Sequence, residues 1–181
     1  MVKVLAVTVA SGLILASILW IVRHIGKWIM NYSKSNNASI DHDIKLFKKF
    51  LEVLPSSSPS IYFLKEHDFG NSFSGDSRDD IKIFLENWET AEYRFLDKNI
   101  ELAKNKLIES CKNFIAKLPH NSWRQGSGGF YTTLPEEYNN MTDVPEAFIP
   151  KIKNLHDIAT DCFNMHQSFI SLCKKKLKTV T

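Results

Sequence analysis

Uncharged and mostly apolar residues run from Val4 to Val22, and basic residues follow at Arg23 and Lys27. Nineteen residues of helix, at a rise of about 1.5 Å each, span roughly 28 Å, which matches the hydrocarbon core of a bilayer. The run ends in Leu-Trp-Ile-Val, whereas a cleaved signal peptide has a shorter apolar region and ends at a small-residue cleavage site. The pattern therefore predicts one N-terminal transmembrane helix.

Beyond the predicted span the pattern becomes amphipathic. Ile25, Trp28, Ile29 and Tyr32 follow the helical spacing i, i+3, i+4, i+7, and the polar residues Lys27, Asn31 and Lys34 lie elsewhere around the helix. This spacing predicts that the helix continues in the membrane interface, where aromatic and basic side chains are favoured. The residues that we expect at this interface are Trp20, Arg23, Lys27, Trp28 and Tyr32.

Small residues recur every four positions within the predicted span, at Thr8, Gly12 and Ala16. Small side chains along one face let two transmembrane helices approach closely. The stripe predicts a packing face for a second copy of the anchor. It is the basis of one alternative hypothesis, in which the chain is a membrane effector that oligomerises through its anchor.

Apolar residues recur at helical spacing through most of residues 40–181. The amphipathic helices that we expect cover residues 40–54, about 77–95, 97–118 and about 148–178. Asp97 is expected to cap the third of them, and the apolar residues of the last recur in two seven-residue series. Residues 61–66 fit either a short helix or a short strand, and residues 120–144, rich in glycine, proline and asparagine, fit a loop. The sequence therefore predicts an all-α fold, in which the single transmembrane helix precedes a bundle of about four amphipathic helices.

This organisation divides the chain into three parts. Residues 1–35 are the anchor with its juxtamembrane extension, and residues 36–39 are a polar linker. Residues 40–181 are one helical-bundle domain, because their apolar faces suffice for a single core.

Charge is distributed unevenly along the chain. Residues 1–35 hold four basic residues and no acidic one, whereas the remainder has one more acidic residue than basic residues. A chain with this balance is not a basic nucleic-acid binder. The basic residues that follow the predicted span place the bundle on the cytoplasmic side by the positive-inside rule. The expected location is the cell (inner, cytoplasmic) membrane, with a single span and a cytoplasmic C-terminal domain.

The three cysteines agree with a reducing compartment. Cys111, Cys162 and Cys173 are odd in number and fall on the apolar faces of predicted helices, so they do not read as a disulfide framework. His166 occupies an apolar position of the last helix and is expected to be a hydrogen-bonded core residue, with a pH-sensing role as the alternative.

Two polar loops, residues 66–76 and 123–131, combine glycines, charges and aromatic side chains. The chain has nineteen lysines and only four arginines, so an arginine can mark a place that needs a planar, bidentate donor. We expect at least one of the three arginines outside the anchor to pair with a loop carboxylate and attach that loop to the bundle. The predicted binding residues are Glu66, His67, Asp68, Arg78, Arg94 and Arg124.

Histidine and aspartate are adjacent at residues 42–43, 67–68 and 156–157. Helical metal phosphohydrolases of the HD type use such a pair, together with a further histidine and aspartate, as metal ligands. Here His67 and Asp68 fall in a predicted loop, and His156 lies off the apolar face of its helix, so surface histidines and capping aspartates are the simpler interpretation. Neither polar loop has the spacing of a nucleotide-binding loop. We therefore predict no catalytic residue, metal or cofactor.

The first functional hypothesis is a membrane-anchored helical domain that acts by protein contact, as an adaptor, a sensor or a subunit of a membrane complex. Its partners are the lipid bilayer and either another protein or a second copy of the chain. The alternatives are the membrane effector and a membrane-tethered, metal-dependent hydrolase. The hydrolase requires His67, Asp68 and a ligand from another helix to converge. The sequence favours a protein that is not an enzyme.

Overall fold

The computed structural model describes residues 20–21, 23–25, 27–28, 30, 37–138 and 144–179. The chain divides into two compact units, Met1–Asp41 and His42–Thr181, and each unit is described by itself. In the first unit all the described residues are helical. Trp20 and Trp28 are exposed there, and the imidazole Nδ1 of His24 lies 3.1 Å from the carbonyl oxygen of Trp20.

The predicted transmembrane helix requires a correction. Within the described part of the chain, no helix combines the length and the apolar character that a membrane crossing needs. Past Trp20 and Ile21, the described helical residues include Arg23, His24 and Lys27, which lower the hydropathy of the segment. This finding overturns the prediction that a transmembrane helix precedes the helical bundle.

Several residues on which that prediction was based lie outside the described residues. They include most of the predicted span, the packing residues Thr8, Gly12 and Ala16, and the interfacial Tyr32.

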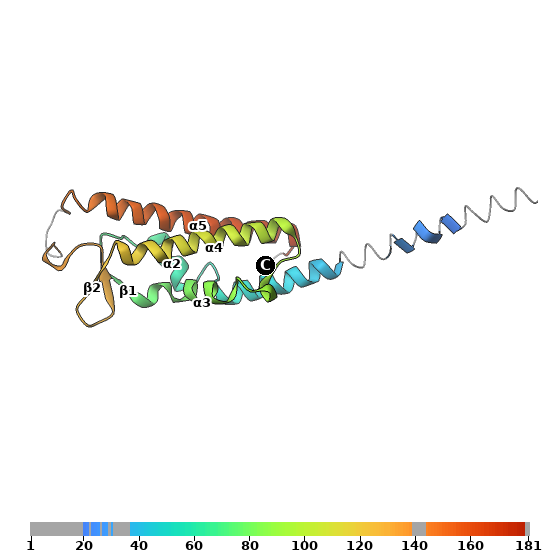
Figure 1. The fold of residues 1–181 in the computed structure, drawn as a ribbon, viewed down its shortest axis with the longest axis horizontal. Helices are drawn as coiled ribbons and strands as arrows, with labels where there is room; N and C mark the ends of the chain where they lie inside the picture. Colours follow the sequence, from blue (N-terminus) through green and yellow to red (C-terminus); the bar gives the residue numbers. More distant parts are fainter. Residues whose placement is uncertain are drawn as a thin grey trace, which may run out of the picture. The chain divides into compact units, whose positions relative to one another are not determined.

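The second unit is mostly helical, as the apolar spacing predicts (Figure 1). Residues 42–53 are helical, and the remaining helices and 3₁₀ turns are α2 (Pro59–Glu66), η1 (Gly75–Arg78), α3 (Asp79–Asn87), η2 (Ala91–Tyr93), α4 (Lys98–His120), η3 (Glu136–Tyr138) and α5 (Ile149–Leu177). The strands are β1 (Phe73–Ser74), β2 (Trp123–Gln125) and β3 (Phe130–Thr132). Figure 1 shows α4 and α5 side by side, with the strands toward the end of the unit at which α5 begins.

Local sequence explains where the helices begin. The Ser58 side chain accepts a hydrogen bond from the backbone N–H of Ile61, and Pro59 stands in the first turn of α2. Asp97 caps α4 through backbone N–H groups of Asn99 and Ile100, as the sequence predicts. Residues 61–66, which fitted either a short helix or a short strand, therefore belong to helix α2.

The long helix predicted near residues 77–95 is shorter than expected. Helix α3 ends at Asn87, and the Thr90 hydroxyl donates a hydrogen bond to the carbonyl oxygen of Asn87. The chain then turns through η2 before it reaches α4. Trp88 and Phe95 are nevertheless buried, so these two apolar residues of the predicted helix reach the core from a bent segment.

The sequence did not predict the small sheet. Its strands are antiparallel in the order β1-β3-β2, and Arg124 lies opposite Tyr131. Gly126 and Gly129 have positive φ angles of 57° and 75° in the hairpin turn, a conformation that glycine adopts without strain. Strands of two or three residues are too short to display the alternation by which strands are recognised.

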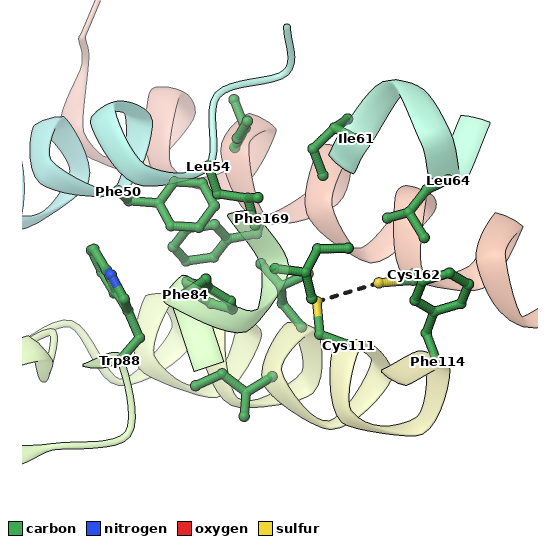
Figure 2. Packing of buried hydrophobic residues seen from close by; sticks show 14 of the residues in the cluster. Phe50, Leu54, Ile61, Leu64, Phe84, Trp88, Cys111, Phe114, Cys162 and Phe169 are labelled. Atoms are coloured by element: carbon green, nitrogen blue, oxygen red, sulfur yellow. Dashed lines mark hydrogen bonds between the residues drawn. The ribbon is translucent and has the colours of Figure 1, made fainter. Parts of the chain in front are cut away.

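Aromatic rings fill the middle of the core (Figure 2). The Phe50 ring packs edge-on against Phe84, Trp88 and Phe169, with ring centroids 5.6, 5.5 and 4.7 Å apart. All four side chains are fully buried. Edge-to-face packing adds about 0.5–1.5 kcal/mol per pair to the free energy of burial. The bundle is therefore centred on this cluster.

His166 lies at the edge of the same core and is fully buried, as the apolar pattern predicts. Its Nε2 donates a hydrogen bond of 2.9 Å to the carbonyl oxygen of Leu54, and its Nδ1 accepts one of 3.0 Å from the Gln167 amide. These two bonds need the neutral imidazole with its proton on Nε2. Burial lowers the pKa of His166, and the bond to Leu54 opposes that effect only in part.

The buried histidine predicts a loss of stability in mild acid. The neutral form is favoured in the folded state, so the unfolded state takes up the proton first as the pH falls below about 6.5. We expect the urea midpoint of the full-length protein to fall between pH 7.5 and 5.5. The fall should be smaller in His166→Gln, whose amide can still donate to Leu54, and unchanged in the control His120→Gln, which alters an exposed side chain. An equal fall in all three proteins would contradict this assignment.

Candidate functional site

The first predicted polar loop leaves the C-terminus of α2 and is held by the carboxylate of Asp68. Asp68 Oδ1 accepts a hydrogen bond of 2.8 Å from the backbone N–H of Gly70, and Oδ2 accepts one of 3.2 Å from the Asn71 amide. A Cβ at Gly70 would lie 3.1 Å from Asp68 Oδ1, so the glycine makes room for this turn. The residues that follow Asp68 in the sequence therefore hold its carboxylate in place.

His67 lies at the end of α2 and is half-buried among aromatic rings. Its ring centroid is 4.7 Å from that of Phe63, 5.1 Å from that of Phe69 and 5.5 Å from that of Phe73. Burial lowers the pKa of His67, and the nearby His156 acts in the same direction, against the effects of the Asn71 backbone and Asp68. The imidazole is therefore neutral at pH 7. Its Nε2 is buried without a hydrogen-bond partner among the described residues.

The structure brings His156 of α5 to this loop, although 88 positions separate it from Asp68. The His156 Nε2 lies 3.4 Å from Asp68 Oδ1, and the His156 ring meets the edge of Phe69 with centroids 5.2 Å apart. His67, Asp68 and His156, which belong to two separate His-Asp pairs in the sequence, are thus neighbours. Both members of the His156–Asp68 pair are substantially exposed, so the pair adds little stability.

This convergence does not form a metal centre. Among the described residues, no three histidine, cysteine, aspartate or glutamate side chains are placed to hold one metal ion. His67 directs its ring into the phenylalanine cluster, while Asp68 uses its oxygens on the loop backbone and on Asn71. His156 is thus the side chain from another helix that the hydrolase hypothesis requires near His67 and Asp68, but in this described region the three are not arranged as a metal site.

A surface cavity of about 510 Å³ adjoins the loop. Polar side chains and two aromatic rings share its lining, which comprises Pro59, Tyr62, Phe63, Glu66, His67, Asp68, Asn71 and Ser77. Glu66 pairs with Lys65 at 2.5 Å at its rim. Three of the predicted binding residues, Glu66, His67 and Asp68, therefore lie together.

The expected ion pair between an arginine and a loop carboxylate is not found among the described residues. Within the described ranges, none of Arg78, Arg94 and Arg124 forms an ion pair with a carboxylate, and the pairs that are present use lysine or histidine. The Arg78 guanidinium lies over the Tyr131 ring, 5.1 Å from its centroid. Tyr131 in turn stacks on the buried Phe73 at 5.9 Å. Cation–π and stacking contacts add to the pairing of β1 with β3 in attaching the hairpin to the bundle, and Arg78 takes part without a salt bridge.

Arg94 lies away from the polar loop, beside α4. Two adjoining cavities of about 590 and 550 Å³ share Arg94, Glu101 and Asn105 in their walls. The buried Lys104 donates to the carbonyl oxygen of Tyr93 at 2.9 Å and pairs with Glu101 at 3.0 Å. Lys104 and Glu101 thus hold the segment before α4 against this helix. The six predicted binding residues do not form one site.

The sequence did not predict an exposed aromatic surface beside the hairpin. Trp123 and Phe130 are 40% and 50% exposed, and the strand register places them on the same face of the hairpin. Trp123 meets the edge of Phe148 at 6.1 Å, just before α5, and Ile149 beside it is 51% exposed.

Lys151 connects the two aromatic rings. Its Nζ lies 5.2 Å from the centroid of the Trp123 ring and 5.5 Å from that of the Phe148 ring. We call this group the aromatic patch: Trp123, Phe130, Phe148, Ile149 and Lys151. A signal in the sequence was available, because the second polar loop is unusually rich in aromatic residues. The fold was needed to place Phe148 beside it.

No family model, curated protein or solved structure matches this chain.

Proposed function

We propose that the second unit is a binding domain without enzymatic activity, which acts by contact with another protein through the aromatic patch. The exposure of Trp123 and Phe130 on one face of a hairpin is the observation that supports this proposal most directly. Tryptophan and other aromatic residues are enriched in the energetic centres of protein interfaces. Isolated exposed apolar residues are ordinary, but a group of neighbouring ones next to cationic side chains is typical of a contact surface.

The rigidity of the patch also supports this proposal. Trp123 is held from two sides, by the Phe148 ring and by the Lys151 ammonium group. The opposite face of the hairpin is attached to the core through Tyr131 and Phe73. A side chain held in its bound geometry before binding loses less entropy on association.

The polar cavity beside His67 is less suited to catalysis. The Asp68 oxygens accept hydrogen bonds from the loop itself, and the neutral His67 ring packs among phenylalanines. Tyr62 and Ser77 contribute hydroxyl groups to the cavity, but no hydrogen bond joins either of them to His67 Nε2 or to the Asp68 carboxylate in the described part of the site. The binding function does not depend on this cavity.

Site-specific photo-crosslinking in cells tests the proposal. A photoreactive phenylalanine analogue at position 123 or 130 should give the same discrete adduct, heavier than the monomer. The matched control is position 106, an exposed residue on α4. Adducts at 106 equal to those at 123, or no adduct at either patch position, would overturn the proposal. An adduct made only of two copies of this chain would identify a homo-oligomer as the partner.

A further inference from the structure

Two of the three cysteines face each other in the core, across the interface between α4 and α5. The Sγ atoms of Cys111 and Cys162 lie 3.3 Å apart, and both residues are fully buried (Figure 2). Both are free thiols, joined by a weak hydrogen bond. Cys173, eleven residues further along α5, is also buried, but its sulfur contacts neither of the other two among these described residues.

We propose that Cys111 and Cys162 form a disulfide bond between α4 and α5 when the chain folds in the presence of a small disulfide oxidant. A disulfide requires the sulfur atoms to close from 3.3 Å to about 2.05 Å. Because the two helices already pack side by side, rotation of the cysteine side chains with a small shift of the backbone achieves this closure (Figure 1). The bond closes a segment in which the two cysteines are 51 positions apart.

The reaction is a thiol–disulfide exchange that balances with glutathione disulfide. The thiolate of one cysteine attacks a glutathione sulfur, breaks the glutathione S–S bond and releases one glutathione thiolate. The thiolate of the second cysteine then attacks the protein sulfur of the mixed disulfide and releases the second glutathione. The two protons from the cysteines end on the two glutathione thiols. Two electrons pass from the protein to the oxidant.

Folding decides when this reaction takes place. The neighbouring Cys162 thiol and burial raise the pKa of Cys111 well above its usual value, so little thiolate is present at neutral pH in the folded protein. Glutathione also cannot reach a sulfur that has no exposed surface. The exchange with glutathione therefore takes place while the chain is still open, and the second step follows as α4 and α5 pack and bring the two sulfurs together. The bond is then protected from reductants. Whether the pair is a disulfide or two thiols therefore depends on whether the compartment in which the chain folded was oxidising or reducing.

Oxidative refolding of the full-length protein tests the proposal. The reduced chain is unfolded in guanidinium, diluted at pH 8 into a mixture of oxidised and reduced glutathione, alkylated and digested with trypsin. Cys162 and Cys173 share the tryptic segment 154–174, so the Cys173→Ala variant is measured beside the wild type. We expect one linked pair, between segments 107–112 and 154–174. The urea midpoint should rise by about 1 M or more relative to the reduced protein.

Two controls make the result specific. Cys111→Ala should give no intramolecular disulfide under the same conditions, and the folded, reduced wild type should oxidise far more slowly than the refolding chain. The proposal is overturned if Cys111 and Cys162 are both recovered alkylated after oxidative refolding. Linkage of Cys173 in the wild type, or a lower urea midpoint in the oxidised form, would also overturn it.

Discussion

Replacing Phe50 by alanine should lower the free energy of unfolding by about 3–5 kcal/mol, because a fully buried aromatic ring is lost from the centre of the core. The Phe50 ring contacts Phe84, Trp88 and Phe169, so the cavity has rings on three sides. Rings that remain packed against their other neighbours cannot collapse fully into the space. The cost should therefore include the cavity as well as the lost burial.

Urea unfolding followed by circular dichroism measures this effect in the full-length protein. Tyr62→Ala is the matched control, because it removes an aromatic ring that is 68% exposed, and it should change the free energy of unfolding by less than about 1 kcal/mol. Equal losses in the two variants would show that the Phe50 cluster is not the centre of the core.

Asp43→Ala should lower the free energy of unfolding by about 3 kcal/mol, although a single acidic residue is altered. Asp43 is only 2% exposed, and its two oxygens accept hydrogen bonds from the backbone N–H groups of Leu96 and Asp97 at 2.8 and 2.9 Å. Alanine leaves these two partly buried donors without a partner, and each such group costs about 1–3 kcal/mol. The contact ties the helix of residues 42–53 to the start of α4.

The Asp43 effect has a close control on the protein surface. Asp157 is exposed and pairs with Lys153 at 2.8 Å, so Asp157→Ala should cost less than about 0.5 kcal/mol. Asp43→Asn keeps one acceptor oxygen and should lie between alanine and the wild type. A loss below 1 kcal/mol in Asp43→Ala would show that water replaces the carboxylate and that this contact does not hold the two elements together.

The sequence predicts those parts of the fold that follow from repeated spacing. The seven-residue series in α5 correctly places Cys162, His166 and Cys173 in the core, since a long helix repeats the same face many times. The Asp97 cap is equally local, because its partners lie two and three residues away. Both inferences need only the geometry of one helix.

The sequence pattern could not predict contacts between segments that lie far apart along the chain. Asp43 reads as a surface or capping residue, and its partners lie more than fifty positions away. The hairpin has strands of three residues and gave no periodic signal, so the exposure of Trp123 and Phe130 was missed. The arginines were expected to pair with loop carboxylates, but Asp68 bonds within the loop, Glu66 pairs with Lys65, and Arg78 lies over a ring instead. The apolar N-terminal run predicted a membrane span that no described helix provides.

The most direct test of the account is the affinity of the cross-linked partner for variants of the patch. Trp123→Ala is compared with Leu102→Ala, which removes an apolar side chain that is 56% exposed on α4. We expect Trp123→Ala to weaken binding by about thirtyfold, as loss of a central tryptophan usually costs at least 2 kcal/mol, and Leu102→Ala to leave it unchanged. Unchanged binding by Trp123→Ala, with the variant folded as the wild type, would contradict a contact function for the aromatic patch.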